Sequence, residues 1–308
     1  MSYSSLVRRL RARVLGHSLC SCFGCPHTPN ALAQCCNAKW HEHRPWMNDY
    51  RIHKHWRLLA GSWPHVDFLN ELFASFPALQ SEINNPLWGV LSRLWDERRD
   101  TNQLAQTLHL ENGHYLPEQG AFVMRRLCGC PDWRNLGYVL VLLGSTSRQF
   151  TTHRSWLRAH FLTYLLLVCM TEPFCFVHQP LYELLNELYE RRFFERIDDW
   201  PSDFAAFDQA CQEFNRYGDW LRYRGRISGW DLYACTLVQH CWPDEACQRQ
   251  NILALVGPPA PFKRSIRQAK WVEAALKGYR RDRFAMGEWS EVADSLPVEP
   301  VPVAAGTS

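Results

Sequence analysis

The sequence has no acidic residue before Glu42, although residues 2–19 contain several arginines. Leu6, Leu10 and Val14 lie on one helical stripe of this segment. The composition is typical of a transit peptide or of a helix that seeks a membrane surface. We favour a simpler interpretation, in which the segment is a helix packed by one side on the body, or a disordered basic arm. The arginines are Arg8, Arg9, Arg11 and Arg13.

Long apolar runs are also absent. The two strongest runs, Tyr138–Leu143 and Phe161–Met170, are far shorter than the roughly 20 apolar residues that span a bilayer. We therefore expect no transmembrane segment and interpret both runs as buried helices. No secretory core follows the first Met, and the 13 cysteines are an odd number. These features favour free thiols in a reducing, intracellular compartment, with the cytoplasm as the expected location.

Familiar catalytic motifs are missing as well. The sequence has no Ser-His-Asp order, no metalloprotease His-Glu-x-x-His helix and no dinucleotide Gly fingerprint. Gly144–Ser147 follows an apolar run but lacks the spacing and the Lys of a P-loop. Whether the protein is an enzyme stays open, because a site assembled from distant residues would leave no motif. The net charge of +3 does not by itself require a nucleic acid partner.

The chain does contain helical patterning, with 46% hydrophobic residues to build a core. Apolar residues recur three and four apart from Trp56 onward, and the prolines divide the pattern into short helices. The Pro-Leu-aromatic segment at residues 86–99 reappears at residues 180–193, with its leucines and paired aromatics at the same relative positions. We predict an all-α fold in which helix pairs at about 63–99 and 156–193 are an internal duplication. Chance similarity between two amphipathic helices is the alternative.

We expect four segments along the chain. Residues 1–55 form a basic, Cys/His-rich N-terminal segment, and residues 56–256 form the helical domain with the duplicated pairs. Residues 257–296 comprise a Pro-rich linker and a basic C-terminal helix, and residues 297–308 are a disordered tail.

The densest chemical cluster lies near the N-terminus. Cys22 and Cys25 have the Cys-x-x-Cys spacing with which a tight turn directs two thiolates at one tetrahedral metal ion. Cys36 and His41 complete the predicted set of four zinc ligands, and Cys20, Cys35 or His43 could replace a member. Such a loop would take its folding energy from the metal. The alternatives are an unstructured Cys-rich leader or lipid-modified thiols.

Basic and aromatic side chains alternate in residues 39–57 and again in residues 216–226. Stacking rings beside cations are used to bind single-stranded nucleic acid. The predicted contacts are Arg51 and Lys54 in the first segment and Arg222 and Arg224 in the second. Both segments must lie on one face if they serve one nucleic acid. Otherwise their rings fill a domain seam or a core edge.

Three functions are consistent with these patterns. We favour a helical interaction scaffold with a protein partner and a structural zinc module at its N-terminus. A nucleic-acid-associated protein that uses the two basic-aromatic segments is the alternative. An enzyme whose site is not readable from the sequence is the third.

Overall fold

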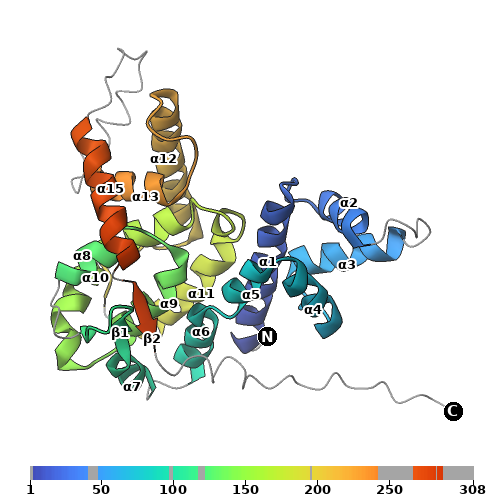
Figure 1. Cartoon of the computed structure of the whole chain (residues 1–308). Coiled ribbons are helices and arrows are strands. Elements are labelled where there is room, and N and C mark those ends of the chain that lie inside the picture. Colours follow the sequence, from blue (N-terminus) through green and yellow to red (C-terminus); the bar gives the residue numbers. More distant parts are fainter. Residues whose placement is uncertain are drawn as a thin grey trace.

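The computed structural model describes residues 3–40, 48–96, 100–116, 122–194, 196–241, 266–281 and 283–286. Most of these residues are helical and very few are in strands, which confirms the predicted all-α class (Figure 1). No described helix combines the length and the apolar character needed to cross a bilayer.

Helices α1 to α5 form what we call the N-terminal lobe, residues 3–83. Its helices are α1 (Tyr3–Phe23), α2 (Pro29–Trp40), α3 (Asn48–Ala60), α4 (Val66–Ser75) and α5 (Pro77–Ile83). The lobe has its own hydrophobic cluster, built from α1, α2, α3, α4 and α5. The predicted boundary between residues 55 and 56 falls within α3, whereas the hydrophobic clusters divide between α5 and the next helix.

The remaining described residues form what we call the helical body, which has a second and larger cluster. Its first half contains α6 (Pro86–Asp96), α7 (Asp100–Gln106), β1 (Leu108–Leu110), α8 (Phe122–Cys128), η3 (Trp133–Asn135), α9 (Leu136–Gly144) and η4 (Arg148–Phe150). Its second half contains α10 (Thr151–Val168), η5 (Phe174–Phe176), α11 (His178–Glu190), α12 (Phe204–Tyr223), α13 (Leu232–Cys241), α15 (Ile266–Arg281) and β2 (Phe284–Met286).

Helix α1 contributes to both hydrophobic clusters and lies where the lobe meets the body (Figure 1). Leu10 and Val14 pack into the body, whereas Leu15 and Leu19 pack into the lobe. The helix is therefore buried on two sides rather than on the single side that its stripe predicted. Arg11 links α1 to α5 within the lobe, because its Nε donates a 2.9 Å hydrogen bond to the carbonyl oxygen of Ile83.

Helix α9 is buried along most of its length and contacts α6, α7 and α10. It contains the apolar run at 138–143, so the interpretation of that run as a buried helix is confirmed. Gly137 permits the close approach of α6, since a Cβ there would lie 2.7 Å from the backbone nitrogen of Leu87. The helical structure of this part of the body ends with α7 at Gln106. Residues 108–110 instead pair antiparallel with residues 284–286, because this edge of the body is covered by returning C-terminal chain.

Helices α6 and α11 show matching burial at the repeated positions. The buried residues are Leu87, Trp88, Val90, Leu91 and Leu94 in α6, and Leu181, Tyr182, Leu184, Leu185 and Leu188 in α11. The segments before them differ, because residues 63–83 form two helices whereas residues 151–176 form one long helix and a 3₁₀ turn. This difference counts against equivalent helix pairs. The duplication of the Pro-containing helix itself stays a prediction.

Candidate functional site

A turn between α1 and α2 brings cysteines together in the N-terminal lobe. Gly24 has φ of +62°, and its N–H and that of Cys25 bond to the carbonyl oxygens of Ser21 and Cys20. This is the Schellman arrangement that ends a helix on a left-handed glycine. Helix α2 then starts at Pro29 after Thr28, whose hydroxyl accepts from the N–H of Ala31 at 3.3 Å. The turn places Cys25 beside the last turn of α1.

Four thiols are neighbours at this turn, and we call them the thiol cluster: Cys20, Cys25, Cys35 and Cys36. The thiol of Cys25 has hydrogen-bonding contacts with those of Cys20 and Cys35, and Cys36 interacts electrostatically with Cys25 and Cys35. Cys20 and Cys36 are buried, whereas Cys25 and Cys35 are half-buried. Burial first, and the neighbouring thiols next, raise the pKa of Cys20 and that of Cys36 to about 12.

The cluster overlaps with the predicted zinc ligands without matching them. Cys25 and Cys36 are in it, but Cys22 is exposed and interacts with Glu82 instead. His41, like His43, lies outside the described residues. Successive helical residues are about 100° apart, so Cys20 and Cys22 on one helix cannot both face α2. Recognising Gly24 as the end of a helix would have identified Cys20 rather than Cys22 from the sequence.

The cysteines that the structure describes are all free thiols, including those of the helical body. Within the described residues, no three His, Cys, Asp or Glu side chains are arranged closely enough to hold a metal ion. The four thiols of the cluster therefore lie near one another without forming a metal site. Their side chains would have to rotate so that the sulfur atoms point toward one position before they could bind a metal.

A polar contact joins the lobe to the body next to the thiol cluster. The Nδ1 atoms of His17 and His27 lie 3.2 Å apart, and both rings stack on Phe176 of η5. The hydroxyl of Ser21 donates to Oε2 of Glu172 at 2.5 Å, and Oε1 of Glu172 lies 3.8 Å from Nε2 of His27. Burial is the main cause that lowers the pKa of His17 to about 4. Neutral imidazoles therefore suit this contact.

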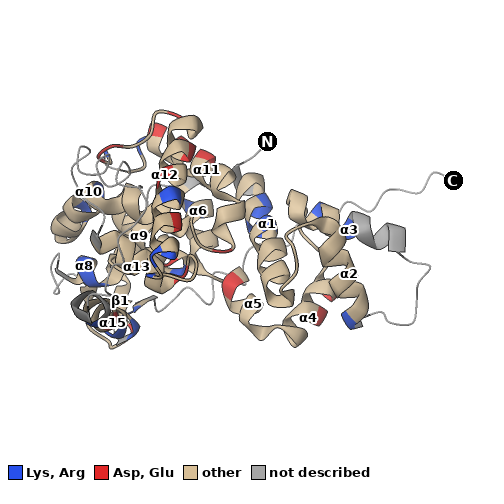
Figure 2. Ribbon diagram, turned by 90° about the horizontal axis from the view of Figure 1, so that it is seen from above, with Lys and Arg blue, Asp and Glu red and all other residues tan. Residues whose placement is uncertain are grey.

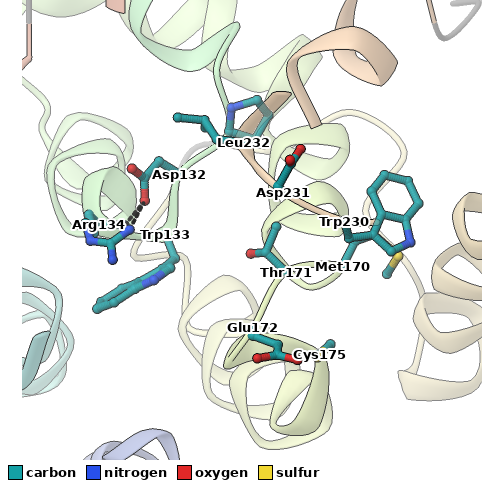
Figure 3. A pocket seen from close by; sticks show the side chains of 11 residues that line it. Asp132, Trp133, Arg134, Met170, Thr171, Glu172, Cys175, Trp230, Asp231 and Leu232 are labelled. Atoms are coloured by element: carbon teal, nitrogen blue, oxygen red, sulfur yellow. Dashed lines mark hydrogen bonds and ion pairs between the residues drawn. The ribbon is translucent and has the colours of Figure 1, made fainter. Parts of the chain in front are cut away.

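An open cleft of about 440 Å³ lies in the helical body beside Glu172 (Figure 3). Three chain segments form it: the turn before η3, the turn after α10 and the turn before α13. Its lining residues are Pro131, Asp132, Trp133, Arg134, Met170, Thr171, Glu172, Cys175, Trp230, Asp231 and Leu232. In Figure 3, Asp231 and Thr171 lie at its centre, with Asp132 and Arg134 on one side and Trp230 on the other.

The acidic side chains of the cleft have structural partners. Oδ1 of Asp132 lies 3.5 Å from Nη1 of Arg134, and Oδ2 accepts from the hydroxyl of Tyr279 at 2.9 Å. Oδ1 of Asp231 accepts a 2.8 Å hydrogen bond from the N–H of Ala234, so Asp231 caps α13. The lining contains three carboxylates and one guanidinium, so the cleft is negatively charged.

The basic-aromatic segments are on separate parts of the molecule, because α3 belongs to the lobe and α12 to the body (Figure 2). Nζ of Lys54 lies 4.1 Å from the centre of the Phe68 ring. Arg222 pairs with Asp219, and the guanidinium of Arg224 lies 5.3 Å from the ring centre of Trp220. The side chain of Arg51 lies outside those that the structure describes.

Comparison of the chain with family models, with curated proteins and with solved structures found no match. The thiol cluster and the cleft therefore have to be interpreted from their own chemistry.

Proposed function

We propose that the protein is a helical interaction scaffold whose N-terminal lobe contains a structural zinc ion bound by the thiol cluster. The neighbouring positions of Cys20, Cys25, Cys35 and Cys36 are the observation that carries this proposal. Four thiolates are a frequent ligand set of structural zinc sites, with zinc–sulfur distances of about 2.3 Å.

The thiols of the cluster have to lose their protons before they can bind a metal ion. Without a metal, burial and the neighbouring thiols raise the pKa of Cys20, Cys25 and Cys36, so these groups stay protonated at neutral pH. A zinc ion reverses the balance, because it binds the thiolate form and releases the protons. Rotation about χ1 of the four side chains is the adjustment that the site requires.

The scaffold role is supported by exposed aromatic rings on several elements. Trp56 is 58% exposed on α3, Tyr223 is 71% exposed at the end of α12, and Trp271 is 43% exposed on α15. Tyr and Trp are enriched in protein–protein interfaces, where their large rings bury apolar area. A protein partner is therefore the partner class that we propose first.

Elemental analysis of the full chain, purified without chelators, tests the zinc site. We expect about one zinc ion per chain, lost in Cys25→Ser and Cys20→Ser because each removes a thiolate ligand. Cys22→Ser is the matched control and should keep the zinc, since Cys22 is exposed and does not interact with the four thiols of the cluster. A zinc-free wild-type protein, or loss of zinc in Cys22→Ser alone, would contradict the proposal. His41→Ala tests the predicted contribution of His41 in the same assay.

Nucleic acid binding is the second candidate, favoured by the exposure of the Tyr223 ring between Arg222 and Arg224. An exposed ring can stack on a base for about 1–3 kcal/mol. Binding of a labelled single strand should weaken with salt and with the double change Arg222→Ala/Arg224→Ala. Equal binding by both proteins, or no response to salt, would remove this candidate.

A further inference from the structure

The cleft of the helical body has an excess of negative charge that its own cation does not neutralise. Arg134 is the basic residue of the lining, and its guanidinium already pairs with the carboxylates of Glu82 and Asp132. Its Nη2 lies 3.1 Å from Oε1 of Glu82, outside the cleft, and its Nη1 lies 3.5 Å from Asp132. Asp231 and Glu172 therefore face the cleft without a described basic residue that neutralises both of them.

Acceptor atoms remain available on these two residues. The hydrogen bond from Ala234 occupies Oδ1 of Asp231, and among the described residues Oδ2 has no protein donor. Oε1 of Glu172 has only the long 3.8 Å contact with His27, and the Glu172 side chain is 54% exposed. Helix α10 ends at Val168, and Met170 and Thr171 follow its C-cap residue Cys169, so the negative end of that helix also lies near the cleft. Each of these features favours a cation.

Apolar side chains line the cleft beside the acceptors. Trp133 and Met170 are almost fully buried, and Trp230 forms part of the opposite side. The indole of Trp230 is fixed in place, because its Nε1 donates to Oδ1 of Asn215 at 3.0 Å. A Cβ at Gly218 would lie only 2.4 Å from this ring, so Gly218 permits the position of the indole. Apolar surface next to acceptors suits the methylene stem of a long basic side chain.

We infer that the cleft binds a Lys or Arg side chain from a basic segment of a partner protein. The inference rests on the proposed scaffold function and specifies that the protein partner binds through a basic side chain. The charged head of the side chain bonds to Asp231 and Glu172, and its stem packs against Trp230 and Met170. The charge of the lining disfavours an anionic ligand, and Arg, which also stacks on indole rings, fits better than Lys.

The probe for this inference is a short fluorescein-labelled peptide in which Arg alternates with Leu, compared with the same peptide containing Glu. We expect the full-length protein to bind the Arg peptide and not the Glu peptide. The double change Asp231→Asn/Glu172→Gln should weaken binding about tenfold, because it removes two partly exposed charge pairs. Binding should also weaken when sodium chloride rises from about 50 to about 300 mM.

The chosen changes keep the structural hydrogen bonds. Asn at position 231 can still cap α13, and Gln at position 172 can still accept from Ser21. Glu187→Gln, which removes a surface charge on α11 that pairs with Arg191, is the matched control and should bind like wild type. Equal binding of the Arg and Glu peptides, or unchanged binding in the double variant, would overturn the inference. Because zinc content is measured separately, failure of peptide binding is distinguishable from failure of the zinc site.

Discussion

Tyr279 joins helix α15 to the start and end of η3 through one hydroxyl group. The hydroxyl donates to Oδ2 of Asp132 at 2.9 Å and accepts from Nδ2 of Asn135 at 3.0 Å. Tyr279 and Asn135 are 2% and 5% exposed, so water has little access to the hydroxyl. Burial raises the pKa of Tyr279, which means that the hydroxyl keeps the proton it donates. Tyr279→Phe removes this hydroxyl and leaves the ring in place.

We expect Tyr279→Phe to lower the free energy of unfolding by about 2–4 kcal/mol. A hydrogen bond to a charged group contributes about 1.5–3 kcal/mol, and a buried donor left without a partner costs about 1–3 kcal/mol. The two contributions share one network, so they do not simply add. Urea unfolding followed by tryptophan fluorescence measures the change. Hydrogen exchange should rise first in α15, because this contact fixes the helix to the body.

Tyr223→Phe is the control for this change. Tyr223 is exposed, so its change should alter the free energy of unfolding by less than about 0.5 kcal/mol. If Tyr279→Phe and Tyr223→Phe unfold at the same urea concentration as wild type, the hydroxyl does not hold α15 as argued. Faster exchange in another helix and not in α15 would refute the same reasoning.

Two further predictions concern packing and pH. Gly137→Ala should destabilise the protein by about 1–3 kcal/mol in urea unfolding, because the new Cβ would meet the backbone of α6. Gly278→Ala on α15, where a Cβ meets nothing within 4 Å, should be neutral or stabilising; equal destabilisation by both would contradict the packing argument. Burial, followed by the charge of Arg125, lowers the pKa of His240 from 6.5 to about 4. The folded state therefore favours the neutral ring of His240. The stability that comes from this preference is complete above about pH 6.5 and is lost as the pH falls to about 4. For a partly buried ring, the loss in the free energy of unfolding is about 1–3 kcal/mol. His240→Gln should flatten this part of the pH profile, and an unchanged profile would show that His240 does not cause it.

The position of the cysteines shows where sequence reasoning about the site stopped. The sequence indicated a cluster at residues 20–43, and the turn residues between the cysteines were visible in it. It did not show that α1 runs to Phe23, which turns Cys22 away and leaves Cys20 beside Cys25. Which thiols lie together depends on the direction in which each residue of the last helical turn points. That direction depends on where the helix ends, and sequence periodicity locates helix ends poorly. The cleft left no motif, because its three segments are far apart along the chain.

The sequence by itself determined the all-α class and the amphipathic faces of helices such as α6 and α11, because leucine spacing fixes which side of a helix is apolar. It also determined that the run at 138–143 is a buried helix. Only the tertiary structure decided that α1 is covered on both sides and that Arg11 bonds to the carbonyl of Ile83 rather than to solvent. The physical reason is that sequence periodicity identifies one apolar face of a helix, whereas the burial of the whole helix depends on which other helices pack around it. Those partners come from chain segments whose meeting no local pattern encodes.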